Sequence, residues 1–135
     1  MSLVVDASAA VEYLLQSSIG LRTASLLDAA DVAAPELLDA EVLAVLRRKV
    51  LTGQLAESRA GEAVADLRDW PVERLRHREL LETAWQLRGH VSAYDAMYVA
   101  AARVRGAALV TADGPLARAP ALGIVIHDVR REAHR

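Results

Sequence analysis

The sequence has no cysteine and no phenylalanine, and aromatic residues make up only 4% of it. The lack of cysteine excludes disulfides, thiolate metal sites and a cysteine nucleophile. Because aromatic side chains are scarce, a folded core must be packed mainly from leucine, valine and alanine. No run approaches the roughly 20 apolar residues that a membrane span requires. The opening "MSLVVDASAA" lacks the basic region of a signal peptide, and Asp6 interrupts its apolar run, so we expect a cytoplasmic protein.

An excess of charge of one sign is also lacking, since 16 basic and 18 acidic residues give a net charge of −2. The chain therefore has no general attraction for nucleic acid, and any contact with phosphate would have to be local. A hydrophobic share of 53% and a charged share of 25% are typical of a folded globular protein. With 135 residues, the chain has a common domain size, and we expect a single domain over residues 1–135.

Short apolar runs alternate with longer segments of helical periodicity. The predicted strands are "SLVVD", "DVAAP", "WPVERL", "AALVTAD" and "GIVIHDV". The predicted helices are "SAAVEYLLQ", with Ser8 as its N-cap, and residues 20–30, 36–51, 57–67, 78–88, 92–105 and 115–118. This alternation is typical of an α/β fold, in which helices flank a mostly parallel sheet, here of about five short strands.

Two acidic residues follow predicted strands. Asp6 closes the first strand, and Asp113 comes two residues after "ALVT". In a parallel sheet both would lie at the carboxyl edge, where α/β proteins bind their ligands. Each also has a simpler explanation, because an aspartate after a strand often caps a helix or begins a turn, and "ADGP" is favourable turn chemistry.

Two further acids lie in predicted helices. Glu41 shares the apolar face of its helix with Leu38 and Val45, and no lysine or arginine stands four residues away. An unpaired buried carboxylate is costly, so we expect a raised pKa, a partner from elsewhere in the fold, or a metal. Asp95 follows Ser92 at capping-box spacing in "SAYD", which explains an acid there without any function.

Considered together, the four acids favour a metal site. Carboxylates within about 4–6 Å of each other repel, and they cannot all stay ionised without a cation. Oxygen ligands without cysteine or a histidine cluster favour Mg²⁺ or Mn²⁺, which can activate water for phosphodiester cleavage. The histidines show no ligand spacing and are expected at the surface; they are His77, His90, His127 and His134.

Four segments resemble the PIN-domain family, in particular the compact bacterial VapC-type toxins of toxin–antitoxin pairs. They are "VVDASAAVEYLL", "APELLDAEVLAVL", "SAYDAMYVAAA" and "ALVTADGPLARAPALGIVI", in the family's order over nearly the whole chain. The resemblance implies a single PIN domain over residues 1–135 and a metal-dependent endoribonuclease. It also implies a homodimer, or a complex with a VapB-type antitoxin whose C-terminal segment covers the active site.

By the same resemblance, the catalytic acids are Asp6, Glu41, Asp95 and Asp113. Three of them, Asp6, Asp95 and Asp113, would ligate Mg²⁺ or Mn²⁺. Ser8 and Thr111 match hydroxyl positions that support the site. Glu12, Glu36 and Asp39 receive no ligand role, because family members vary there.

Two alternatives remain open. A non-catalytic binding module could use the acidic pocket for a structural cation or for an arginine of a partner. A phosphatase of the aspartyl-phosphate type could begin from Asp6, but such enzymes usually need a second aspartate where Ser8 stands. Apolar side chains at 13–15 and in the helices of residues 21–51 could contact a dimer mate or an antitoxin helix, although ordinary core packing also explains them.

Overall fold

The computed structural model describes residues 1–119 and 122–132. Within them, five strands form one sheet in the order β3-β2-β1-β4-β5. The strands are β1 (Ser2–Val5), β2 (Asp31–Pro35), β3 (Glu73–Leu75), β4 (Ala108–Thr111) and β5 (Ile126–Asp128). Every neighbouring pair is parallel. The predicted α/β fold is therefore confirmed, and the described sheet is entirely parallel.

Most helices follow the predicted ranges closely, but one predicted range is divided. The helices are α1 (Ala7–Leu15), α2 (Ser18–Asp28), α3 (Leu37–Leu51), α4 (Glu57–Asp69), α5 (Leu81–Gln86), α6 (Ala93–Arg105), α7 (Gly114–Ala117) and α8 (Val129–Glu132). The last helix was not predicted, since its first residue, Val129, falls in the predicted strand "GIVIHDV". The prediction of one helix over residues 78–88 is wrong, because a separate 3₁₀ turn, η1 (His77–Glu79), precedes α5. The backbone N–H of Leu80 closes this turn on the His77 carbonyl at 2.9 Å, and Leu80 is buried in the core.

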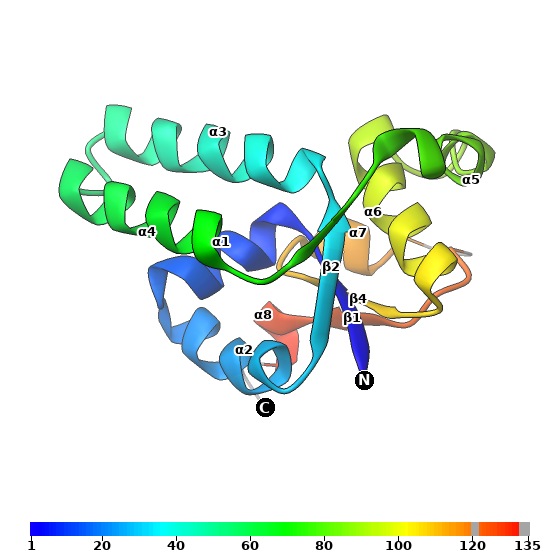
Figure 1. The fold of residues 1–135 in the computed structure, drawn as a ribbon, viewed down its shortest axis with the longest axis horizontal. Coiled ribbons are helices and arrows are strands. Elements are labelled where there is room, and N and C mark those ends of the chain that lie inside the picture. The colour runs from blue at the N-terminus through cyan, green and yellow to red at the C-terminus, as the bar shows by residue number, and fades with distance from the viewer. Residues whose placement is uncertain (120–121, 133–135) are drawn as a thin grey trace.

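Strand β1 is the point at which the chain reverses its direction across the sheet. From β1 the chain adds β2 and then β3 on one side, and it later returns to place β4 and β5 on the other. Figure 1 shows α1 to α4 on one side of the strands and α5 and α6 on the other. Ligands of α/β proteins bind beyond the carboxyl ends of the strands at such a switch point. The end of β1 is therefore the expected position of a site.

The core is built from aliphatic side chains, as the lack of aromatics predicts. Val4 and Val5 of β1 and Leu109 and Val110 of β4 are all fully buried. Helix α6 contacts β1, β2 and β4, and the small side chains of residues 99–102 let it lie close against the sheet. Of the helices in the described part of the chain, none has the length and apolarity to cross a lipid bilayer.

Candidate active site

Asp6 lies at the corner between β1 and α1, and only 4% of it is exposed. Its Oδ1 accepts hydrogen bonds from the Ser8 hydroxyl at 2.6 Å and from the Ala9 backbone N–H at 3.0 Å. The Thr111 hydroxyl donates to its Oδ2. Asp6, and not Ser8, is thus the N-cap of α1, so that part of the prediction is wrong. A carboxylate at the end of the strand already accepts from one of the free N–H groups in the first turn of the helix.

The two hydroxyl side chains join the end of β4 to the corner after β1. Ser8 Oγ accepts a hydrogen bond from the Ala112 N–H at 2.9 Å, and Thr111 Oγ1 accepts one from the Asp113 N–H at 3.0 Å. The two hydroxyl oxygens are themselves 3.3 Å apart. Ser8 and Thr111 therefore fix the Asp6 carboxylate and the backbone that leads to Asp113 in one network.

The surroundings of Asp6 disfavour the ionised form of its carboxyl. Burial raises its pKa from 3.8 to about 6, and the nearby charge of Asp113 contributes to this rise. The hydrogen bonds from Ser8, Thr111 and the Ala9 backbone act in the opposite direction but do not outweigh burial. A buried carboxylate with a raised pKa beside a second acid is typical of a functional site.

Asp95 lies in the first turn of α6, and its helix begins as predicted. Ser92 is the N-cap, and its Oγ accepts a hydrogen bond from the Asp95 backbone N–H at 3.2 Å. Burial raises the pKa of the half-buried Asp95 carboxyl, and the charges of Asp113 and Glu41 raise it further. Its role in the helix start therefore coexists with a position among the other acids.

Glu41 has a hydrogen-bond partner from elsewhere in the fold, which is one of the three outcomes expected for a carboxylate on an apolar helix face. Its Oε1 accepts a hydrogen bond from the Tyr98 hydroxyl at 2.6 Å. Tyr98 belongs to α6 and is 2% exposed. The sequence alone does not single out Tyr98. A tyrosine inside an apolar helical run indicates a core residue, and its acceptor lies 57 residues away along the chain.

Asp113, the fourth acid, lies two residues after the end of β4. Its carboxylate caps the short helix α7, since Oδ1 accepts a hydrogen bond from the Leu116 N–H at 3.4 Å. The capping explanation therefore holds for Asp113, and its charge still reaches both Asp6 and Asp95. The four predicted acids thus come from the ends of β1 and β4 and from α3 and α6.

The donor set suits a hard divalent cation, although the acids do not already form a cage. Among residues 1–119 and 122–132, no three His, Cys, Asp or Glu side chains are arranged to hold a metal ion as they stand. Mg²⁺, however, is usually held by one or two carboxylates and keeps several of its waters. Burial is the main cause of the raised pKa values of Asp6 and Asp95, and the charge of Asp113 adds to both. A cation would relieve this added repulsion. These residues fit such an ion.

Two neighbouring acids are engaged elsewhere, which agrees with their having no predicted ligand role. Asp39 pairs with Arg74 at 3.0 Å. Glu12 accepts a hydrogen bond from the Ser17 hydroxyl at 2.5 Å and pairs with Arg130 at 3.1 Å.

The histidines do not all lie at the surface as predicted. His77 is half-buried, and its Nε2 accepts a hydrogen bond from the Leu37 backbone N–H at 2.9 Å. His127 is also half-buried, whereas His90 is exposed. His134 lies outside the described residues.

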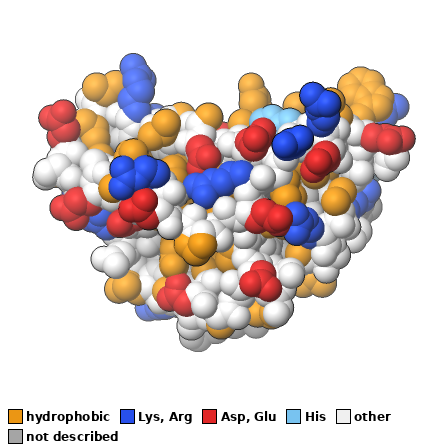
Figure 2. Space-filling view, viewed as in Figure 1, with side chains coloured by type: hydrophobic (Ala, Val, Ile, Leu, Met, Phe, Trp, Pro, Cys, Tyr) orange, Lys and Arg blue, Asp and Glu red, His pale blue; other side chains and the backbone are white. Residues whose placement is uncertain are grey.

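Figure 2 shows that the surface is hollowed between the side formed by α3 and α4 and the side formed by α5 and α6. Acidic and basic side chains are interspersed there, so no broad field of one sign covers this view of the molecule. This agrees with the small net charge and with a site that depends on local contacts.

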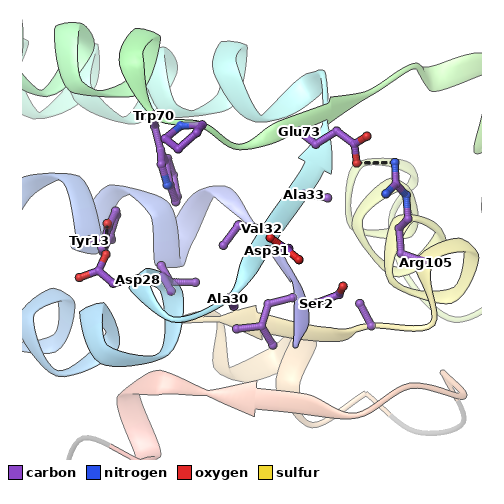
Figure 3. Close-up of a pocket in the computed structure, with 14 residues that line it drawn as sticks. Ser2, Tyr13, Asp28, Ala30, Asp31, Val32, Ala33, Trp70, Glu73 and Arg105 are labelled. Atoms are coloured by element: carbon purple, nitrogen blue, oxygen red, sulfur yellow. Dashed lines mark hydrogen bonds and ion pairs between the residues drawn. The ribbon is translucent and has the colours of Figure 1, made fainter.

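A cavity of about 620 Å³ lies at the opposite edge of the sheet, where β1, β2 and β3 begin (Figure 3). Four of its polar side chains pair with one another: Arg105 pairs with Glu73, and the Tyr13 hydroxyl donates to Asp28 at 2.5 Å. The rings of Tyr13 and Trp70 lie 4.9 Å apart on one side of it. None of the four predicted acids lines this cavity, so it is not the site described above.

Comparison with known proteins agrees with this geometry. A family model described as the PIN domain matches residues 3–122. The chain belongs to the PIN-domain family. Among its relatives, Ribonuclease VapC1 of Mycobacterium tuberculosis is 44% identical over 131 residues, which cover 94% of this chain and 97% of that protein. Ribonuclease VapC9 of the same organism is 38% identical over 82% of this chain and 85% of its own length.

Solved structures support the fold. The crystal structure of PAE2754 from Pyrobaculum aerophilum has a TM-score of 0.67 at 21% identity, covering 100% of this chain and 97% of that one. The structure of VapBC2 from Rickettsia felis, bound to a DNA fragment from their promoter, contains a chain with a TM-score of 0.57 at 18% identity. That match covers 94% of this chain and 98% of the other.

Proposed function

We propose that this chain is the toxin of a VapBC-type pair, an endoribonuclease that hydrolyses RNA phosphodiester bonds with Mg²⁺ or Mn²⁺. One observation carries the proposal. Four carboxylates from separate elements gather at the switch point of a PIN fold, in a chain 44% identical to a VapC ribonuclease over almost its whole length. The intact set of acids favours catalysis over a binding module that has no turnover.

The proposed ligands are Asp6, Asp95 and Asp113, with Glu41 assisting directly or through water. Once bound, the ion would activate water for attack on phosphorus and offset the charge on the leaving oxygen. The side chains around the acids hold the proposed ligands in position. Asp6 is held by Ser8 and Thr111, and Ser92 orders the first turn of α6 on which Asp95 stands.

We also propose that a VapB-type antitoxin inhibits this activity in the cytoplasm and that the protein forms a homodimer or a complex with this antitoxin. Apolar side chains support a partner-covered surface, since Leu21 of α2 and Leu43 and Leu51 of α3 are exposed. Of residues 13–15, Leu14 is buried in the core and Tyr13 and Leu15 are half-buried, which agrees with the alternative of ordinary core packing.

The test is cleavage of single-stranded RNA by purified, antitoxin-free protein in Mn²⁺, with EDTA and Asp6→Asn as controls. We expect cleavage in Mn²⁺ alone and products that carry a 5′-phosphate and a 3′-hydroxyl. Single-stranded RNA is chosen because its backbone and bases are accessible to a shallow site. Asp66→Asn, at an exposed aspartate of α4, is the matched variant and should cleave normally.

Three results would contradict the proposal. Cleavage that persists in EDTA, or full activity of Asp6→Asn, would exclude this use of the acids. If Mn²⁺ binds and no RNA is cut, the binding-module alternative becomes the better explanation.

A further inference from the structure

Tyr98 lies three residues after Asp95 on α6, and its whole side chain is enclosed by the core. Tyrosine is rarely buried so completely unless its hydroxyl has a partner, because an unpaired buried hydroxyl costs about 1–3 kcal/mol. Here that partner is a carboxylate of the proposed active site. Phenylalanine would fill nearly the same space, so packing alone does not account for the hydroxyl.

The hydroxyl joins elements that carry three of the four acids. It donates to Glu41 Oε1 of α3 at 2.6 Å, from a helix that also carries Asp95. It lies close enough to Asp6 and to the Ala7 backbone for both to affect it. Burial first, and then the bond to Glu41, raise the pKa of Tyr98 far above its ordinary value, so the hydroxyl remains a donor.

The hydrogen bond restricts what the Glu41 side chain can do. A glutamate side chain on an open helix face has several rotamers, and fixing one of them costs conformational entropy. The bond engages Oε1 and leaves Oε2 without a bond to Tyr98. It also keeps the Glu41 charge within reach of Asp95, whose pKa it helps to raise.

We propose that Tyr98 is a positioning residue, whose hydroxyl holds Glu41 in the arrangement that a divalent cation and its water require. This inference rests on the proposed function, because it assigns Tyr98 a part in the same site. Tyr98 acts through Glu41 and touches neither the cation nor the RNA.

The experiment measures Mn²⁺ binding to the purified, antitoxin-free chain by titration calorimetry and compares Tyr98→Phe with the wild type. We expect Tyr98→Phe to weaken Mn²⁺ binding about tenfold, the size of effect known for residues that orient metal ligands. Tyr94→Phe is the matched control, because it removes the same hydroxyl from the same helix, one turn earlier, at a side chain that is 62% exposed. It should bind Mn²⁺ as the wild type does.

A double-mutant cycle with Glu41→Gln separates positioning from a purely structural role. If Tyr98 acts through Glu41, the variant with both substitutions should bind Mn²⁺ no more weakly than Glu41→Gln alone. In RNA cleavage at saturating Mn²⁺, Tyr98→Phe should lower kcat and leave KM for RNA unchanged. Circular dichroism of each variant verifies that it is folded.

Two outcomes would overturn the inference. One is wild-type Mn²⁺ affinity in folded Tyr98→Phe. The other is a loss of Mn²⁺ binding free energy in the double variant that equals the sum of the losses in Tyr98→Phe and Glu41→Gln. Failure of the proposed function would look different, since a chain that binds Mn²⁺ but cuts no RNA would still show whether Tyr98 controls its affinity.

Discussion

At the scale of single residues, Asp6 combines a structural benefit with an energetic cost. Its carboxylate caps α1 and receives two hydroxyl groups, yet it is buried beside another acid. The rise of its pKa from 3.8 to about 6 corresponds to roughly 3 kcal/mol against the ionised form. A protein can retain such a cost when the residue is needed for function.

Asp6→Asn should therefore remove activity and also change how stability depends on pH. Because the pKa of Asp6 in the folded state is raised above its ordinary value, the folded protein binds more protons than the unfolded chain between about pH 4 and pH 6. In the metal-free wild type, the contribution of Asp6 to the free energy of unfolding should fall as the pH rises through this window. Asp6→Asn should lack this fall and have a larger free energy of unfolding at neutral pH.

Urea denaturation of the metal-free proteins from about pH 4 to neutral pH provides the measurement. The exposed variant Asp66→Asn should follow the wild-type curve. An Asp6→Asn protein that is less stable than the wild type at neutral pH would show that the hydrogen bonds to the carboxylate outweigh its burial.

At the scale of elements, the start of α3 depends on a distant residue. Glu36 occupies the N-cap position but makes no side-chain cap bond, and His77 of η1 supplies an acceptor to the Leu37 N–H instead. The contact joins the beginning of the helix that carries Glu41 to the segment after β3. Free N–H groups at a helix start need such partners.

His77→Ala should lower the free energy of unfolding by about 1 kcal/mol, because it leaves this N–H without its side-chain acceptor. His90→Ala changes the same residue type at an exposed position and should have little effect. Urea denaturation of the two variants beside the wild type measures the difference. Equal stabilities of the two variants would mean that water replaces the lost acceptor at no cost.

The sequence predicted the elements well because their signals are local. Each of the five strands lies within a predicted apolar run, and the acids after β1 and β4 lie at the carboxyl edge as expected. The cap of α1 was assigned incorrectly because Asp6 and Ser8 both have suitable side chains two residues apart. Only the backbone geometry decides between them.

Contacts between distant segments could not be read from the sequence. Tyr98 bonds Glu41, which lies 57 residues away along the chain, and His77 bonds the Leu37 N–H, which lies 40 residues away. Periodicity places Tyr98 in the core but carries no information about which polar group faces it. The assignment of Asp6, Glu41, Asp95 and Asp113 as a set therefore depended on a family resemblance as much as on their positions.

At the scale of the whole molecule, the topology concentrates negative charge that the composition does not reveal. The net charge is only −2, yet order β3-β2-β1-β4-β5 brings acids from four separate segments to the end of β1. Their repulsion lowers the stability of the metal-free fold. A divalent cation that binds the folded chain and not the unfolded one should restore it.

Mg²⁺ or Mn²⁺ should thus raise the melting temperature of the wild type. At about ten times its Kd, the ion stabilises the folded state by about 1.4 kcal/mol, or about 5 °C for a chain of this size. Asp95→Asn should lose most of this rise because it removes a proposed ligand, whereas the exposed Asp66→Asn should keep it. Differential scanning calorimetry in EDTA and in excess ion distinguishes them. An equal rise in all three proteins would place the bound ion away from the carboxyl edge of β1.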